Sequence, residues 1–244
     1  MSTRANLSFP PPLEHEVIET PANERRGRGQ ATLTTWDAGR FADEQIQRLV
    51  RQVFFPGWPK PARHVVVTAV DEDADVAGIC LHVGEVLAQH VDGRVGVIET
   101  TLEMPEFEDV FGVKDAIAAN REGFNSLRSA AHQISNRLWL VPPTSFWGTG
   151  ADDSSVTSLE TTVGQVRHDF DYAVLHASPA AKSSEAAVLG HMCDGVILVL
   201  EAHATHRVVA QKVKETLQAA NVRVLGAILS GRTFPIPESF YRKL

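Results

Sequence analysis

Residues 65–77 read VVVTAVDEDADVA, an apolar run followed by an acidic turn that leads into a helix. A short run rich in β-branched residues favours a strand that is covered on both faces of its sheet. After residue 77, similar short runs alternate with segments whose apolar residues recur at helical spacing. This alternation is typical of βαβ units. The sequence therefore predicts an α/β fold with three layers, α/β/α, around a mostly parallel sheet.

The same patterns place the individual elements. The predicted strands are 65–70, 95–98, 138–141, 172–175, 196–200 and 224–229. The predicted helices lie near 75–90, 122–134, 154–167, 182–193 and 205–220, and an amphipathic helix from Phe41 to Phe55 precedes them. We expect a disordered tail at 1–40, the amphipathic helix with its linker at 41–62, the α/β domain at 63–232 and a C-terminal tail at 233–244.

Composition and charge exclude several classes of function. No window approaches the roughly 20 apolar residues that cross a bilayer, so we expect no direct membrane insertion. A formal net charge of -7 argues against a nucleic-acid partner. The two cysteines, Cys80 and Cys193, lie far apart in apolar surroundings, which favours reduced thiols in a cytoplasmic protein.

The turn after the first strand is where an open α/β sheet places its ligand crevice. A phosphate-binding loop needs glycines, a lysine and a serine or threonine, and residues 71–77 contain none of them. The turn instead carries four carboxylates, and Asp73 or Asp75 is a suitable N-cap for the helix. A calcium loop fails because Val76 stands where glycine is required and His82 where glutamate is required. We therefore expect no bound metal and a turn that repels a triphosphate.

Later segments carry a resemblance to a known family. Residues 98–105 read IETTLEMP, residues 170–179 read FDYAVLHASP, residues 194–200 read DGVILVL and residues 224–230 read VLGAILS. In order and spacing they resemble the cytoplasmic ATPase domain of bacterial capsule and exopolysaccharide tyrosine kinases, relatives of the septum-site and chromosome-partitioning ATPases. The resemblance covers roughly residues 41–244 and implies a P-loop NTPase-like fold.

At the positions where that family contacts nucleotide and metal, this sequence departs from the family pattern. Residues 73–77 align with the phosphate loop, so that Asp73 and Asp75 lie in it, Val76 takes the place of the lysine and Ala77 that of the magnesium-binding hydroxyl. The remaining departures are Glu99 and Thr101 for the two aspartates of the second motif, His176 for the metal-associated aspartate and Ser230 for the asparagine that faces the base. We expect a degenerate pocket with no catalytic residue and no cofactor.

The resemblance implies a non-catalytic regulator or adaptor of exopolysaccharide biosynthesis or export, recruited to the inner face of the membrane by a polysaccharide chain-length or export protein. One alternative is an ATP- and magnesium-dependent tyrosine kinase that uses a displaced Lys60, Lys114 or Lys182, with Tyr241 as a possible acceptor. Another is a self-assembling scaffold, because residues 45–51 match the family's ring-forming helix with Arg48 and Arg51 kept. His176 near Glu99 lacks the ligand count that a metal requires.

Overall fold

The computed structural model describes residues 38–55, 61–71, 74–101, 126–147 and 156–231. The chain divides into two units, residues 1–36 and 37–244, and all described residues belong to the second unit. The predictions for residues 1–37, for the C-terminal tail at 233–244, for Asp73 and for Tyr241 lie outside the described residues. Residues 38–40, which were predicted to belong to the disordered tail, begin a helix instead.

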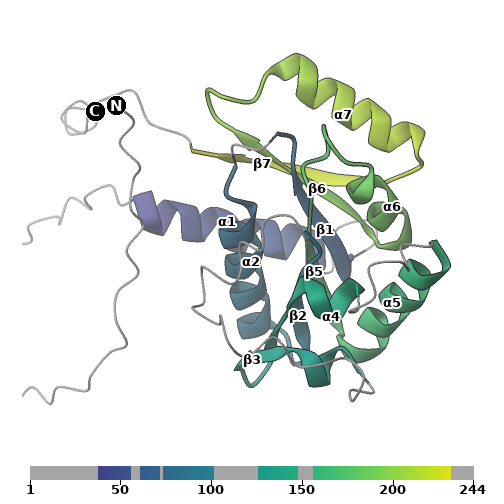
Figure 1. Cartoon of the computed structure of the whole chain (residues 1–244). Helices are drawn as coiled ribbons and strands as arrows, with labels where there is room; N and C mark the ends of the chain where they lie inside the picture. Colours follow the sequence, from purple (N-terminus) through teal and green to yellow (C-terminus); the bar gives the residue numbers. More distant parts are fainter. Residues whose placement is uncertain (1–37, 56–60, 72–73, 102–125, 148–155, 232–244) are drawn as a thin grey trace, which may run out of the picture. The chain divides into compact units, whose positions relative to one another are not determined.

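The described residues form a seven-stranded sheet in the order β3-β4-β2-β5-β1-β6-β7 (Figure 1). Every pair is parallel except β3 with β4. The predicted α/β architecture with a mostly parallel sheet is confirmed. The strands are β1 (His64–Ala69), β2 (Val95–Glu99), β3 (His132–Ser135), β4 (Leu138–Val141), β5 (Tyr172–Ala177), β6 (Gly195–Glu201) and β7 (Val224–Ser230).

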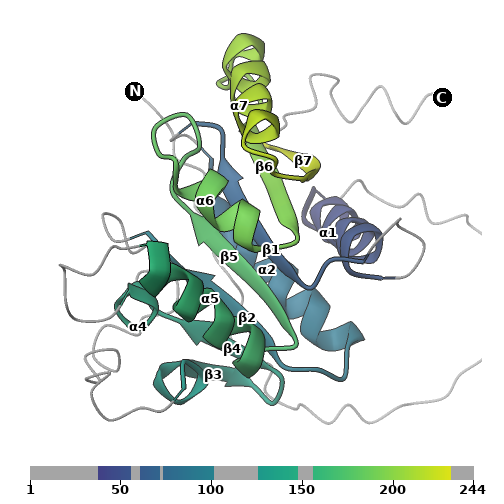
Figure 2. The ribbon, with the colours of Figure 1, turned by 90° about the vertical axis from the view of Figure 1, so that its right-hand side faces the viewer.

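Helices cover both faces of this sheet (Figures 1 and 2). On one face, α1 (Ala38–Phe54) and α2 (Val76–His90) pack on a core cluster that includes Val50, Leu87 and Val97. On the other face, a second cluster contains residues of α4 (Pro143–Trp147), α5 (Val156–Asp169), α6 (Glu185–Met192) and α7 (Arg207–Ala219). Residues 65–67 have no exposed surface, because β1 is covered on both sides as its apolar run predicts.

The helix predicted near 122–134 is wrong where the structure describes that segment. A short 3₁₀ helix (Arg128–Ala130) is followed by β3, which pairs antiparallel with β4 across the turn at Asn136 and Arg137. Leu127 and Ile134 have the spacing of one helical face, but they pack from separate elements. The short α4 was also missed, since its five residues are too few to show a period.

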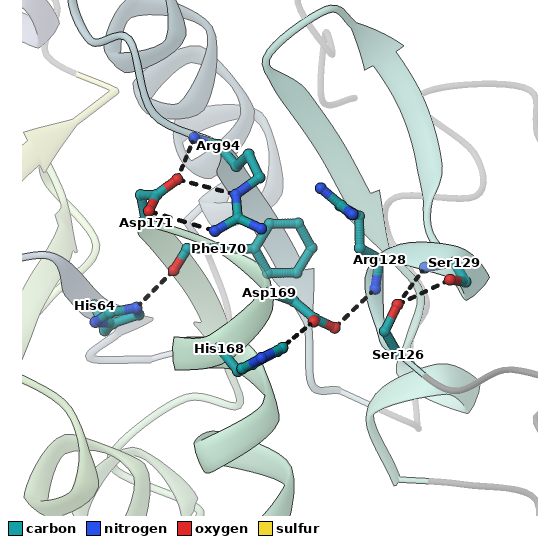
Figure 3. Close-up of polar contacts among 9 residues, drawn as sticks. All are labelled: His64, Arg94, Ser126, Arg128, Ser129, His168, Asp169, Phe170 and Asp171. Atoms are coloured by element: carbon teal, nitrogen blue, oxygen red, sulfur yellow. Dashed lines mark hydrogen bonds and ion pairs between the residues drawn. The ribbon is translucent and has the colours of Figure 1, made fainter.

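Aspartates hold the amino ends of the central strands together. The backbone N–H groups of Arg63 and His64 donate to Oδ2 of Asp194 at 2.8 and 2.9 Å. The backbone N–H and Nε of Arg94 donate to Oδ2 of Asp171 at 2.8 and 3.0 Å (Figure 3). Each carboxylate thus joins two neighbouring strands, β6 with β1 and β5 with β2. These contacts provide acceptors for backbone N–H groups at the amino ends of the strands, where the β-ladder offers none.

Further contacts close the same edge. His64 Nε2 lies 3.2 Å from the carbonyl oxygen of Phe170, which only accepts, so Nε2 carries the proton (Figure 3). Burial lowers the pKa of His64 and keeps the ring neutral. Asp169 accepts from the backbone N–H of Arg128 at 3.2 Å and lies 3.1 Å from His168 Nδ1. The segment 168–171 therefore fixes β5 to the elements on either side of it.

Among the described residues, no helix combines the length and the apolar character that a membrane crossing requires.

Candidate functional site at the carboxyl edge of the sheet

The strand order brings three predicted site segments to one place. Strands β2, β5 and β1 are neighbours, and their carboxyl ends carry Glu99, His176 and the turn at Asp71. Glu99 and His176 are registered opposite each other in the β2–β5 ladder. In an open α/β sheet, ligands bind beyond this edge. The carboxyl ends of β1, β2 and β5 therefore form the candidate site.

Glu99 and His176 form a buried pair at its centre. Oε2 of Glu99 lies 2.8 Å from Nδ1 of His176, and the two residues expose 0% and 5% of their surface. The other oxygen, Oε1, accepts the backbone N–H of Thr101 at 2.8 Å. Both carboxylate oxygens of Glu99 are thus occupied by groups of the chain itself. A buried pair of this kind is weak evidence for stability, but losing either partner leaves a polar group stranded in the interior.

Thr100 links this pair to α6. Its Oγ1 donates 2.7 Å to the carbonyl oxygen of His176 and also lies against Oε1 of Glu185 in a short contact. Glu185 Oε2 accepts the backbone N–H of Ser178 at 3.3 Å, and Trp147 Nε1 donates 2.6 Å to the carbonyl oxygen of Thr100. Side chains from α4 and α6 therefore close over the ends of β2 and β5.

In the turn that leads into α2, the carboxylates are likewise bonded to groups of the chain itself. Asp75 caps the helix, with its Oδ1 accepting the backbone N–H of Gly78 at 2.9 Å. Val76 and Ala77 follow, and they expose 2% and 1% of their surface within the core cluster under α2. Asp71 Oδ1 accepts the hydroxyl of Thr205 at 3.1 Å. The N-cap predicted at Asp73 or Asp75 is confirmed at Asp75.

The other predicted site residues are spread more widely. Ser230 lies at the carboxyl end of β7, with β1 and β6 between it and β5. Arg48 and Arg51 are exposed on α1. The side-chain hydroxyl of Thr101 is buried and has no hydrogen-bond partner in the described residues. Asp73 lies outside them.

Sequence reasoning missed Thr100, Glu185 and Trp147. Their roles depend on contacts between residues up to 85 positions apart in the chain. A threonine after a strand and a glutamate at a helix start are too common to carry a signal. Only the folded topology brings them together.

The residues that the structure describes at this edge do not fit a magnesium-nucleotide complex. The positions that align with the lysine and the magnesium-binding hydroxyl are buried aliphatic side chains, which offer neither charge nor a donor. The position of the metal-associated carboxylate is an imidazole that is paired with Glu99. Among the described residues, no three His, Cys, Asp or Glu side chains form a group that could hold a metal ion. This geometry closes the site with the chain's own groups.

Several known proteins are similar to this chain in sequence or in structure. No protein-family model matches the chain. Over 197 residues, the chain is 22% identical to the tyrosine-protein kinase YwqD of Bacillus subtilis strain 168, covering 78% of this chain and 81% of that kinase. The chain is a relative of the bacterial tyrosine-protein kinases. A 65-residue segment is 32% identical to the tyrosine-protein kinase CpsD of Streptococcus agalactiae serotype III strain NEM316, over 27% of this chain and 28% of CpsD.

Solved structures share the fold of this chain. The kinase domain of VpsO superposes with a TM-score of 0.65 at 18% identity, over 80% of this chain and 98% of that domain. A chain of the MinC:MinD cell division protein complex of Aquifex aeolicus is more distant, with a TM-score of 0.55 at 18% identity over 69% of this chain and 68% of that chain. The resemblance predicted from the motifs is confirmed, and so is the P-loop NTPase-like fold.

Proposed function

We propose that this chain is a non-catalytic regulator or adaptor in exopolysaccharide or capsule biosynthesis, which acts by binding a membrane chain-length or export protein. The chain is similar to bacterial tyrosine kinases in sequence and in fold. The motif residues Asp171 and Asp194 accept hydrogen bonds from backbone N–H groups at the strand ends. Their retention preserves the scaffold independently of catalysis.

The buried pair of Glu99 and His176 is the observation that carries this proposal. Phosphoryl transfer depends on cations and donors that neutralise the charge of the phosphates. Here Val76, Ala77 and His176 stand at the lysine, hydroxyl and metal-carboxylate positions, and Glu99 is satisfied internally. A site closed in this way leaves the outer surface of the domain for binding a partner.

Radiolabelled ATP separates the adaptor from a kinase. The purified chain is incubated with magnesium and labelled ATP, alone and with membranes that contain the chain-length protein. We expect no phosphotyrosine on Tyr241 or on the membrane protein, and we expect the chain-length protein to co-purify with the chain. A sustained phosphotyrosine signal, or no association with the chain-length protein, would contradict the proposal. A catalytically active kinase relative serves as the positive control.

The kinase alternative has one specific observation in its favour. Lys182 lies in the loop between β5 and α6, at the same edge of the sheet as the candidate site, and it is exposed. Lys60 and Lys114 lie outside the described residues. If phosphotyrosine appears, Lys182→Ala should abolish it on this reading, whereas the exposed Lys212→Ala on α7 should leave it unchanged.

The scaffold alternative rests on α1. Arg48 and Arg51 are three residues apart on the exposed side of this helix, where a neighbour's carboxylates would have access to both. If this face drives assembly, Arg48→Ala with Arg51→Ala should convert an oligomer to a monomer in sizing with light scattering. Gln52→Ala, an exposed change on the same helix, should have no effect. An assembly state that all variants share would rule the scaffold out.

A further inference from the structure

The two edge strands of the sheet differ in length and polarity. Strand β3 has four residues, HQIS, and is polar and largely exposed. The opposite edge strand, β7, has seven residues, VLGAILS, without a charge or a proline. Proteins ordinarily protect sheet edges with short strands, charges or prolines, because an unprotected edge pairs with another strand. Strand β3 follows this rule and β7 does not.

The outward backbone groups of β7 belong to Ala227 and Leu229. The carbonyl oxygen of Ser230 accepts the backbone N–H of Ala202, so Ser230 directs its backbone groups toward the end of β6. The direction of these groups alternates along a strand, so those of Ile228 also point to β6, whereas those of Ala227 and Leu229 point away from it. Within the described residues, β7 pairs with β6 alone.

The side chains of these residues lie on known faces of the sheet. Ala227 and Leu229 are registered with Leu198 and Leu200 of β6, which pack in the core cluster that contains residues of α7. Leu229 is nevertheless 56% exposed. Ile228 faces the other way and packs against the cluster under α1 and α2. An uncovered leucine beside outward backbone groups is suited to an added strand.

We propose that the added strand is β7 of a second copy of this chain, running antiparallel about a two-fold axis at Ile228. In this register, Ala227 of each copy lies opposite Leu229 of the other. Both residues direct their backbone groups outward, so each pair exchanges N–H···O bonds in both directions, as hydrogen-bonded pairs of an antiparallel ladder do. This contact goes beyond the proposed adaptor function and uses no residue of the candidate site.

The side chains agree with this register on both faces. Opposite residues of an antiparallel pair share a face, so Ala227 of the second copy covers the exposed Leu229, and the two leucines become diagonal neighbours. On the other face, the two Ile228 side chains meet at the axis in a non-hydrogen-bonded pair, which is the closer type of pair. An unrelated strand would need matching apolar residues, whereas the two-fold symmetry supplies them from the chain itself.

The charges also favour antiparallel self-pairing. Strand β7 has no charged residue, so no like charges come to lie opposite each other. Arg223 directly precedes β7, and at the other end the carboxylate of Glu201 lies against Gly231. Antiparallel pairing places the amino end of one β7 beside the carboxyl end of the other. Arg223 of each copy therefore approaches Glu201 of the other copy, and the opposite charges attract.

Size-exclusion chromatography with light scattering tests the pairing. The full chain should have the mass of two chains. Leu229→Lys changes an exposed side chain and sets two ammonium groups close together near the axis, so this variant should have the mass of one chain. The matched control is Val208→Lys, the same charge change at a valine of α7 that is 79% exposed. It should keep the mass of two chains.

Amide hydrogen exchange at two protein concentrations locates the contact. The amides of Ala227 and Leu229 should exchange at least about tenfold faster when the full chain is diluted to a monomer, whereas the amide of Ile228, bonded to β6, should not change. A full chain with the mass of one chain would overturn the proposal. So would a dimer that persists in Leu229→Lys, or exchange of the Ala227 and Leu229 amides that does not depend on concentration.

The same measurements separate this contact from assembly through α1. Arg48→Ala with Arg51→Ala changes residues of α1 and leaves β7 intact, so the dimer should remain. A dimer that is lost in this variant but kept in Leu229→Lys would also contradict the pairing of β7.

Discussion

At the scale of single residues, the carboxylates at the two ends of the strands have different roles in this domain. Asp171 and Asp194 lie at the amino edge and hold backbone donors of neighbouring strands. Glu99 lies at the carboxyl edge and is paired with His176. The family motifs contain all of these positions, but only those at the carboxyl edge differ from the kinase pattern.

Asp171→Ala should destabilise the domain by about 1 to 2 kcal/mol, because the backbone N–H of Arg94 loses its acceptor. Urea unfolding at neutral pH measures the change. Asp92→Ala is the control, since Asp92 pairs with Arg137 but its side chain is 98% exposed. That change should be near zero. Equal effects of the two substitutions would contradict the assigned role of Asp171.

The contribution of Asp171 should also depend on pH. Hydrogen bonding to Arg94 lowers the pKa of Asp171 below its usual value. A carboxyl group with a lower pKa in the folded state stabilises the fold above its unfolded pKa, near 3.9, and loses this contribution as the pH falls through the folded pKa. The difference in unfolding free energy between the wild type and Asp171→Asn should therefore be constant near neutral pH and shrink below about pH 4.

Glu99 and His176 should behave as a coupled pair. Glu99→Leu or His176→Leu alone leaves a buried polar partner behind and should cost about 3 kcal/mol. The double substitution removes both groups and should cost clearly less than the sum. A double-mutant cycle by urea unfolding measures the coupling. Additive effects would show that the two side chains do not support each other.

At the scale of elements, the sequence predicts those whose periodicity is simple. Strands β1, β2, β5 and β6 are apolar runs covered by helices, and β7 is an apolar run at the edge of the sheet. The predicted bounds of these strands agree with the structure within two residues. The polar edge strand β3 has no such run, and Leu127 and Ile134 imitate a helical face. In the site, Asp75 was predictable because capping is local. The contact of Thr100 with Glu185 was not, because it depends on how the fold places the first residue of α6 beside the carboxyl end of β2.

Helix α2 should depend on its cap. Asp75→Ala removes the acceptor of the Gly78 N–H and should cost about 1 kcal/mol of unfolding free energy. Asp75→Ser keeps a capping oxygen and should recover most of the loss. Thermal unfolding of the three proteins measures the order. If Asp75→Ser is as unstable as Asp75→Ala, charge rather than capping explains the role of Asp75.

At the scale of the whole molecule, the domain keeps the fold of bacterial tyrosine kinases while its nucleotide-contacting positions carry other chemistry. The aliphatic side chains of Val76 and Ala77 lie at the start of α2, and the imidazole of His176 pairs with the buried carboxylate of Glu99. On the proposed function, this domain acts through what it binds and not through turnover.

Titration calorimetry with magnesium-ATP tests this account most directly. The full chain is titrated beside an active kinase relative under the same conditions, and the relative must show binding heat. For this chain we predict no saturable heat at nucleotide concentrations up to the millimolar range. Saturable binding with micromolar affinity would contradict the account.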